Sequence, residues 1–233
     1  MELSKRLTMI ADLVSPCDCM ADIGTDHGFI PIKLVKEGRC KHAFAMDVGV
    51  GPLERAKEHI KSHGLEERIE CRLSDGYEKL EAEEADSTVI AGMGGDLMVR
   101  ILSAGLKRDV LTKELILSPH SEWHKVREFL RLHGYKTEKE AMVWEDRKYY
   151  VAIKAKKAES TDVSDPVEDA FGTYLLEEKN EVLKDYLLFL KNRYEKILAN
   201  LEKIDSDSAA KSRLENIGQL ELVKGALSRY ENV

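Results

Sequence analysis

The sequence predicts an α/β fold with a largely parallel, seven-stranded sheet, followed by a C-terminal antiparallel helical hairpin. Over most of the chain, short apolar runs typical of buried strands alternate with longer runs of helical periodicity. Two extended runs then follow each other with only a short turn between them, as in a β-hairpin. The end of the chain repeats apolar residues at spacings of four and three, which is the pattern of packed helices.

The composition is typical of a soluble protein with no general affinity for nucleic acid. The 233 residues include 36 Lys and Arg against 43 Asp and Glu, a net charge of −7. No apolar run approaches the roughly 20 residues of a membrane span, and charges interrupt the first apolar stretch, unlike in a signal peptide. We therefore expect a cytoplasmic protein without membrane contact. An RNA ligand would need a local basic patch.

The four cysteines are expected to be structural thiols. Cys17 and Cys19 lack the two-residue spacer of a zinc knuckle, and no second pair of Cys or His follows at ligand spacing. A disulfide framework is not expected in a protein of this size and setting. The sequence therefore predicts no metal site.

The first element is a helix that ends near Leu13, with Leu3, Leu7 and Ile10 on one apolar face. Ser4 is a candidate N-cap. Lys5 and Arg6 lie off the apolar face. Because this helix leads straight into the first strand, they either border a ligand crevice or form an ordinary solvated face.

The segment Met20–Pro31 is the one around which the fold is organised. A strand, Cys19–Asp22, runs into a turn with Gly24, Asp26, His27 and Gly28, and a helix follows from Phe29 to about Glu37. Glycines allow close approach of a ligand to the backbone, and the helix start offers free N–H groups. Asp22 and Asp26 would repel the pyrophosphate of a dinucleotide. A ligand with an ammonium group and ribose hydroxyls fits better, and S-adenosylmethionine is such a ligand.

The next two strands add acidic residues at their ends. The strand His42–Asp47 ends at Asp47, where a doubly wound fold places the carboxylate that binds ribose hydroxyls. A helix from Pro52 to about Ser62 follows. The strand Ile69–Leu73 precedes Asp75, which either accepts a hydrogen bond from an adenine amino group or is an ordinary turn residue.

The fourth and fifth strands are followed by glycine- and proline-containing turns. Ser87–Ile90 leads into Ala91-Gly92-Met93-Gly94-Gly95, where glycine density indicates that something approaches the backbone closely. A helix is expected over Asp96–Ser103. The strand Glu114–Leu117 leads into Pro119-His120 and a helix that ends at Gly134. All five turns follow strand carboxyl ends, so we expect them to meet at one crevice.

The remainder of the chain is predicted to form a hairpin, a linker and two helices. The hairpin pairs Thr137–Trp144 with Tyr149–Ala155, and 156–166 reads as a linker. We place a domain boundary at 157/158, with domains 1–157 and 158–233. The heptad positions of the hairpin helices are Leu190, Tyr194, Ile197, Leu201 and Ile204, then, after Asp205–Ser208, Leu214, Ile217, Leu220, Val223, Leu227 and Tyr230. This coiled coil either packs on itself or dimerises, or acts as a substrate-positioning arm.

Four segments together resemble the bacterial tRNA (adenine-22-N1)-methyltransferase (TrmK) family. They are LSKRL at the start, MADIGTDHGFIP, the SDG after the third strand and above all IAGMGG after the fourth. The resemblance covers nearly the whole chain. It implies a Rossmann-like class I methyltransferase domain, S-adenosylmethionine as cofactor, and methylation of N1 of adenine 22 in the D-arm region of tRNA.

The resemblance also implies roles for individual residues. Arg6 and the Gly94-Gly95 turn would border the target base. Cofactor contacts would be made by Asp22, Gly24, Asp26, His27, Asp47, Asp75, Gly76, Ala91, Gly92 and Met93.

Other residues have more than one possible role. Met93, Tyr149 or Tyr150 could face the target base, although both tyrosines also suit a hairpin core. His27 could bind the methionine moiety, act as a general base, or be an ordinary turn residue. Ser118-Pro119-His120 departs from a Gln-Pro-Asn-like turn, which leaves the contact of that loop with the base open.

Other functions remain possible at this stage. The enzyme could methylate a small molecule or a protein, which the lack of a broad basic face favours. A nicotinamide-dependent oxidoreductase is disfavoured by the acidic turn, and a non-catalytic interaction protein using the helical hairpin is a further alternative. The oligomeric state cannot be predicted from one chain.

Overall fold

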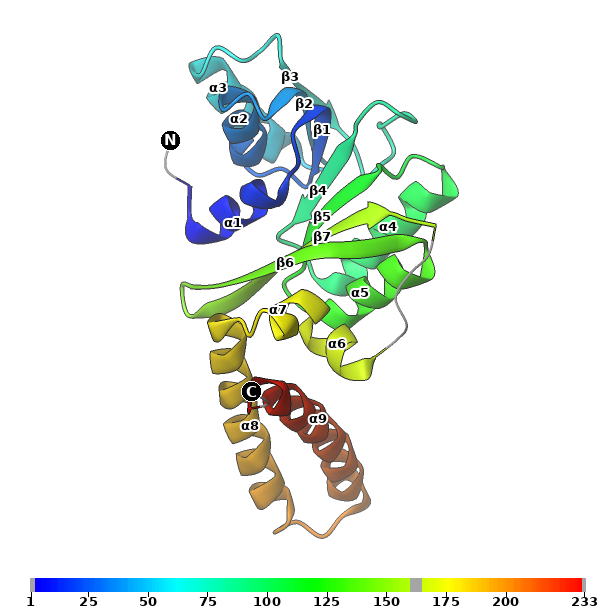
Figure 1. Cartoon of the computed structure of the whole chain (residues 1–233). Coiled ribbons are helices and arrows are strands. Elements are labelled where there is room, and N and C mark those ends of the chain that lie inside the picture. The colour runs from blue at the N-terminus through cyan, green and yellow to red at the C-terminus, as the bar shows by residue number, and fades with distance from the viewer. Residues whose placement is uncertain (1–2, 160–164, 232–233) are drawn as a thin grey trace. The chain divides into compact units, whose positions relative to one another are not determined.

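The chain divides into two compact units, Met1–Asp162 and Val163–Val233. This division is taken from a computed structural model, which describes residues 3–159 and 165–231 (Figure 1). The first unit contains the sheet and its helices, and the second is helical throughout its described part.

The first unit is built on a seven-stranded sheet in the order β3-β2-β1-β4-β5-β7-β6. Neighbouring strands from β1 to β5 pair in parallel, whereas β7 pairs antiparallel with both β5 and β6. This confirms the predicted parallel sheet with a final hairpin. The strands are β1 (Cys17–Ile23), β2 (Cys40–Asp47), β3 (Ile69–Leu73), β4 (Ser87–Ala91), β5 (Glu114–Ser118), β6 (Tyr135–Glu145) and β7 (Lys148–Lys157).

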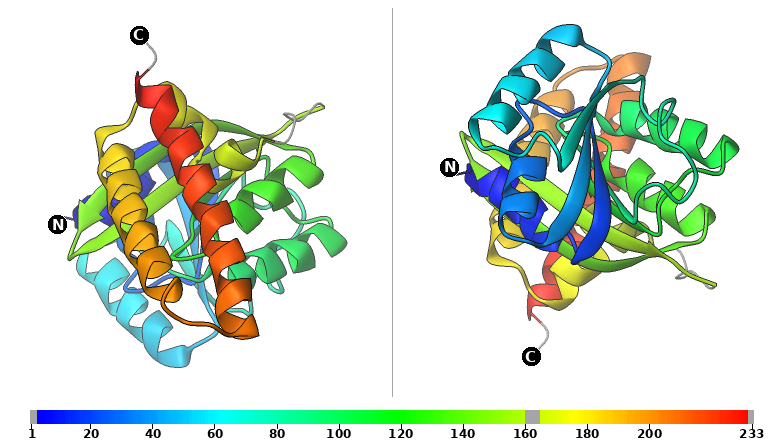
Figure 2. Two further views of the ribbon diagram at one scale, coloured as in Figure 1. Left: turned by 90° about the horizontal axis from the view of Figure 1, so that it is seen from below. Right: turned by 90° about the horizontal axis from the view of Figure 1, so that it is seen from above.

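Helices cover both faces of this sheet (Figure 2). One face is covered by α1 (Lys5–Leu13), α2 (Phe29–Lys36) and α3 (Val50–Ser62), and the other by α4 (Gly95–Lys107) and α5 (Trp123–Leu132). From β1 the chain moves outward through β2 to β3, then returns to β4 on the other side of β1. A crevice for ligands is expected where the strand order reverses, outside the carboxyl ends of β1 and β4.

Complete burial of apolar side chains explains why these elements form. Ile10, Met20, Ile32, Val89 and Ile116, from three strands and two helices, are all fully buried.

Local signals set the helix starts. The hydroxyl of Ser4 accepts a hydrogen bond from the Leu7 N–H at 3.3 Å, which confirms the predicted cap of α1. The helix α3 begins two residues earlier than predicted, at Val50, so that Pro52 lies in its first turn.

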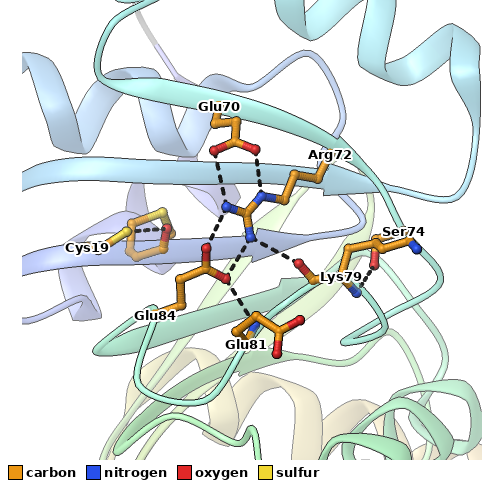
Figure 3. A network of polar contacts seen from close by, with 8 residues as sticks. Cys19, Glu70, Arg72, Ser74, Lys79, Glu81 and Glu84 are labelled. Atoms are coloured by element: carbon orange, nitrogen blue, oxygen red, sulfur yellow. Dashed lines mark hydrogen bonds and ion pairs between the residues drawn. The ribbon is translucent and has the colours of Figure 1, made fainter.

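Arg72 holds the outer edge of the sheet together (Figure 3). Its guanidinium donates to both oxygens of Glu70 (2.8 and 3.1 Å) and of Glu84 (2.6 and 2.7 Å). The same group lies over the ring of Phe44, 3.7 Å from its centroid. Because Glu84 belongs to the connection that leads to β4, these paired hydrogen bonds fasten that connection to the edge strand.

The linker predicted at about 156–166 is slightly too long at both ends. The strand β7 continues to Lys157, and Pro166 begins a helix, α6 (Pro166–Phe171). The carboxylate of Asp165 caps this helix by accepting hydrogen bonds from the N–H groups of Val167 and Glu168. Of the predicted linker, residues 160–164 lie outside the described residues.

The second unit contains the predicted antiparallel hairpin, formed by α8 (Glu181–Leu201) and α9 (Asp207–Glu231). The short helix α7 (Thr173–Glu177) and α6 pack against α9, and Arg229 binds the carboxylates of Asp165 and Glu168 at 2.5 and 2.7 Å. These two short helices were not predicted.

The apolar seam of this hairpin differs from the predicted heptad positions. Leu183 and Leu187, which were not assigned to it, are fully buried, whereas Ile204, Leu214 and Ile217 are about half or more exposed. The buried apolar positions of α8 therefore lie nearer its start than predicted.

The described cysteines are free, and the sulfur atoms of Cys17 and Cys40 lie 2.8 Å apart where β1 and β2 begin. Among the described residues no helix is long and apolar enough to cross a membrane. In the same part of the chain, no three His, Cys, Asp or Glu side chains are grouped as metal ligands.

Candidate active site

A cavity of about 390 Å³ lies where the strand order reverses. This volume suits a small-molecule ligand. Its walls come from α1, the turns after β1, β2, β4 and β5, and the start of α2. The lining residues are Arg6, Leu7, Asp22, Gly24, Asp26, Phe29, Ile30, Asp47, Ala91, Gly92, Met93 and His120.

The turn after β1 is fixed by backbone contacts that require a glycine. The N–H groups of Gly24 and Thr25 both donate to the carbonyl of Met46 in β2, at 2.8 and 2.9 Å. Gly24 has φ +79°, and a Cβ there would lie 2.1 Å from the terminal methyl of Met93. The turn therefore brings β1 and the loop after β4 into contact without leaving space for a side chain.

Asp22 places a carboxylate deep in the cavity. It is only 5% exposed. Burial raises the pKa of Asp22 to about 6, and the negative charge of Asp47 adds to this shift. A positively charged ligand group beside Asp22 would reverse the shift by stabilising the ionised form.

Asp47 supplies the second carboxylate, at the end of the neighbouring strand. One of its oxygens accepts a hydrogen bond from the N–H of Gly49 at 2.6 Å, which orients the side chain. The parallel register pairs Asp22 with Ala45, so both carboxylates lie at the same edge of the sheet. This end of the cavity is acidic, as predicted from the turn sequences.

The other end of the cavity is cationic and aromatic. The Nη1 atom of Arg6 lies 3.5 Å from Nε2 of His120, and its guanidinium is 5.3 Å from the ring centroid of Tyr150. The rings of His120 and Tyr150 meet edge to face at 5.5 Å. The backbone N–H of His120 donates to the carbonyl of Met93 at 2.8 Å, which joins the loops after β5 and β4.

His120 is held neutral by its surroundings. Burial, Arg6 and Lys148 together lower the pKa of His120 below its ordinary value of 6.5. A neutral imidazole has one acceptor nitrogen, and because the Arg6 guanidinium can only donate, this acceptor is Nε2 and the hydrogen is on Nδ1. This end of the site therefore offers an imidazole N–H, a guanidinium and an aromatic ring.

The glycines after β4 serve different purposes. Gly92 has φ +82° and lines the cavity, where a Cβ would lie 3.8 Å from the Arg6 guanidinium. A Cβ on Gly94 would lie 3.2 Å from the Ser121 hydroxyl, and one on Gly95 would lie 2.6 Å from the Ser121 carbonyl. At Gly95, the group that approaches the backbone is thus the chain after β5 and not a ligand.

Replacing Gly95 by Ala is therefore expected to lower the free energy of unfolding by about 1–3 kcal/mol, because two carbonyl oxygens occupy the space of the new Cβ. Chemical denaturation would measure this. The control is Gly51→Ala in α3, whose Cβ would meet its nearest neighbour, the Arg55 guanidinium, at 3.6 Å and should leave stability unchanged or slightly higher. Equal stability of Gly95→Ala and the unaltered protein would contradict this explanation.

The ring of His27 is part of an aromatic stack beside the cavity. Its ring stacks on Phe29 at 5.1 Å and on His59 at 5.2 Å, and its Nε2 lies 3.4 Å from Asp26. The His27 backbone has φ +63°, and its carbonyl contacts Nδ1 of His59 at 3.0 Å. Asp26 also pairs with Arg55 at 3.2 Å. These contacts give His27 a role in shaping the turn.

Several predicted site residues lie away from the cavity surface. Asp75 is exposed in the turn after β3, and Gly76 has φ +55° with a Cβ position 3.0 Å from Ile101. The hydroxyl of Ser74 donates to the Gly76 carbonyl and orders this turn. Of the described residues to which the resemblance gives a role in the site, those that do not line the cavity are His27, Asp75, Gly76, Gly94 and Gly95.

Other lining residues were not assigned to the site from the sequence. Leu7, Phe29 and Ile30 carry no polar group, so only their places at the starts of α1 and α2 could have indicated them. Tyr150, which does not itself line the cavity, was weighed both as a residue that faces the target base and as part of a hairpin core. Its strand position alone could not show that it would meet Arg6 and His120, which come from distant segments.

Comparison with protein families and with individual proteins gives a consistent result. Residues 3–153 match the family model described as a methyltransferase domain. The tRNA (adenine(22)-N(1))-methyltransferase of Bacillus subtilis (strain 168) is 34% identical over 186 residues, which cover 78% of each chain.

Solved structures extend the similarity to nearly the whole chain. The crystal structure of the B. subtilis m1A22 tRNA methyltransferase TrmK matches with a TM-score of 0.88 and 30% identity, covering 97% of this chain and 98% of that one. The structure of M. capricolum TrmK in complex with S-adenosyl-homocysteine, its natural cofactor product, matches with a TM-score of 0.86 and 26% identity, covering 98% and 99%.

Proposed function

Since the chain belongs to the family of tRNA (adenine(22)-N(1))-methyltransferases, we propose that it transfers a methyl group from S-adenosylmethionine to N1 of adenine 22 in the D-arm region of tRNA. The observation that carries this proposal is the cavity itself. Its acidic end suits the cofactor, and its cationic and aromatic end suits an adenine. The two ends are joined through Met93, whose carbonyl holds His120 and whose side chain covers Gly24.

The acidic end fits S-adenosylmethionine by its chemistry. The buried Asp22 carboxylate would bind the ammonium group, and the free oxygen of Asp47 would accept hydrogen bonds from the ribose hydroxyls. Phe29 and Ile30 offer apolar contact for the adenine of the cofactor. Gly24, Asp26, Ala91, Gly92 and Met93 complete the proposed binding surface. Asp75, Gly76 and His27, which do not line the cavity, remain predicted cofactor contacts.

The opposite end would hold the target base. When bound, S-adenosylmethionine supplies an electrophilic methyl group, and the lone pair on adenine N1 is the nucleophile. The residues therefore have to position the base and exclude water, and no covalent nucleophile is needed. The neutral His120 accepts a hydrogen bond from the Arg6 guanidinium and orients it, while the remaining N–H groups of Arg6 donate to an acceptor on the base or its phosphate. Tyr150 packs against both Arg6 and His120 and supports their positions.

A base within a folded tRNA is stacked on its neighbours, so the target base has to leave its stack to enter the cavity. We place the reaction in the cytoplasm, with tRNA as the macromolecular partner.

Labelling of tRNA tests this function. The purified protein is incubated with radiolabelled S-adenosylmethionine and unmodified bulk tRNA, and the digested nucleosides are identified. The expected product is N1-methyladenosine, at position 22 after mapping. A protein that binds the cofactor by calorimetry but leaves tRNA unlabelled would instead methylate a small molecule or a protein. The net charge of −7 is the observation that favours this second candidate.

A further inference from the structure

The turn between β6 and β7 carries cations beside the Arg6 end of the cavity. Asp146 and Arg147 form a two-residue turn, with φ +48° and +60°. Both values lie in the left-handed region, which glycine adopts freely and arginine rarely adopts. Local backbone preference therefore does not account for an arginine at this position.

Contacts with α1 fix the turn beside the cavity. The carboxylate of Glu145, the last residue of β6, accepts hydrogen bonds from the backbone N–H groups of Lys5 (2.7 Å) and Arg6 (3.2 Å). Glu145 thus joins the hairpin to the first turn of α1. As a result, Lys5 lies next to the turn while the Arg6 side chain reaches the cavity.

Strand alternation places Lys148 on the same side. Lys148 and Tyr150 are two residues apart in β7, so their side chains share one face of the hairpin. Tyr150 contacts Arg6 and His120, and Lys148 is close enough to contribute to the lowered pKa of His120.

Lys5, Arg147 and Lys148 are exposed. Within residues 3–159 and 165–231, none of these three side chains has a carboxylate partner. By contrast, Arg55 and Lys125, on the surface of the same unit, are both paired with aspartates. The acidic residues next to them in the hairpin are Glu145, whose carboxylate is hydrogen-bonded to backbone N–H groups of α1, and Asp146. The turn therefore has an excess of positive charge in a chain whose net charge is −7.

We propose that Lys5, Arg147 and Lys148 form a phosphate-binding rim, which holds the RNA backbone on either side of the target adenosine. A base that leaves its stack rotates about its backbone, so its flanking phosphates stay at the mouth of the cavity. Cations at that mouth neutralise phosphates and position the nucleotide without reading its sequence. This inference rests on the proposed function and names the part of the surface that the tRNA contacts.

The double variant Arg147→Gly/Lys148→Gln tests the rim. It is expected to weaken tRNA binding about 10- to 100-fold and to reduce the slope of log affinity against log salt by about one to two. The affinity for S-adenosylmethionine, measured by calorimetry, should stay the same. The single variant Arg147→Gly is informative because glycine suits this turn: it should melt at the same or a higher temperature and still bind tRNA more weakly.

The matched control is Lys36→Gln. Lys36 is an exposed lysine at the end of α2, a helix that leads back to the amino ends of the strands, so it lies away from the cavity. This variant loses one charge and should keep the tRNA affinity and the salt slope. If the double variant binds tRNA like the unaltered protein, or if Lys36→Gln weakens binding equally, the rim is refuted. Absence of tRNA methylation by the unaltered protein would instead refute the proposed function.

Discussion

Replacing Asp22 by Asn is expected to weaken S-adenosylmethionine binding about 100-fold or more at pH 7. The side chain keeps its size but loses the charge that would pair with the ammonium group in a site shielded from water. Calorimetric titration with the cofactor measures the effect. The control Asp18→Asn removes an exposed carboxylate from the other end of the same strand and should leave the cofactor affinity unchanged.

The same residue predicts how cofactor binding depends on pH. Because burial raises the pKa of Asp22 to about 6, the carboxyl group of the unliganded protein is mostly ionised at pH 7 and mostly protonated at pH 5. The ammonium group binds the ionised form, so the apparent affinity should fall about tenfold between pH 7 and pH 5. Asp22→Asn should show no such dependence over this range. Cofactor binding by Asp22→Asn with unaltered affinity would refute the assignment.

The free energy of unfolding of the unliganded protein should change with pH in the opposite direction to the cofactor affinity, rising as the pH falls. The unfolded chain ionises Asp22 near its ordinary pKa of 3.8, whereas the folded protein does so near 6. Raising the pH from 4 to above 6 therefore costs the unliganded fold about 3 kcal/mol, and this cost is absent below pH 4. The unliganded Asp22→Asn variant should accordingly have a higher free energy of unfolding than the unaltered protein at pH 7, with no gain at pH 4.

Much of the fold followed from the sequence because its signals are local. Buried parallel strands are continuous apolar runs bounded by turns, and the bounds predicted for Ile69–Leu73 are those of β3. The short helices α6 and α7 were missed because much of what holds them is the packing of distant residues such as Arg229. Exposure of Ile204 and Leu214 shows the same limit, since a heptad spacing does not say which partner covers it.

The acidic half of the site was easier to predict than the half that faces the base. Asp22 and Asp47 follow strands at positions where the topology alone brings them together. The cluster of Arg6, His120 and Tyr150 depends on three segments far apart in the chain, and on the hairpin register that brings Tyr150 to the other two. A single sequence contains no local pattern that predicts contact between residues so far apart in the chain.

Replacing Arg6 by Ala is expected to lower the turnover of tRNA about 100-fold, with a cofactor affinity within about twofold of the unaltered protein. A guanidinium beside the base can hold it in place through its rigid fork of N–H donors. A misplacement of the base by about 1 Å would lower the rate about 100-fold. Single-turnover methylation at saturating cofactor measures the effect. Arg6→Lys keeps the charge and loses the fork, so it should recover tRNA affinity more than rate.

Histidine titration separates this positioning role from a purely structural one. The positive charge of Arg6 is one of the causes that lower the pKa of His120, so Arg6→Ala should raise this pKa towards 6.5, which NMR would detect. His120 would then be protonated in a larger fraction of molecules near neutral pH. The rate of Arg6→Ala should stay low as the pH rises, because deprotonation of His120 does not replace the missing guanidinium. A normal rate at pH 7 together with an unchanged His120 titration would show that Arg6 does not face the base.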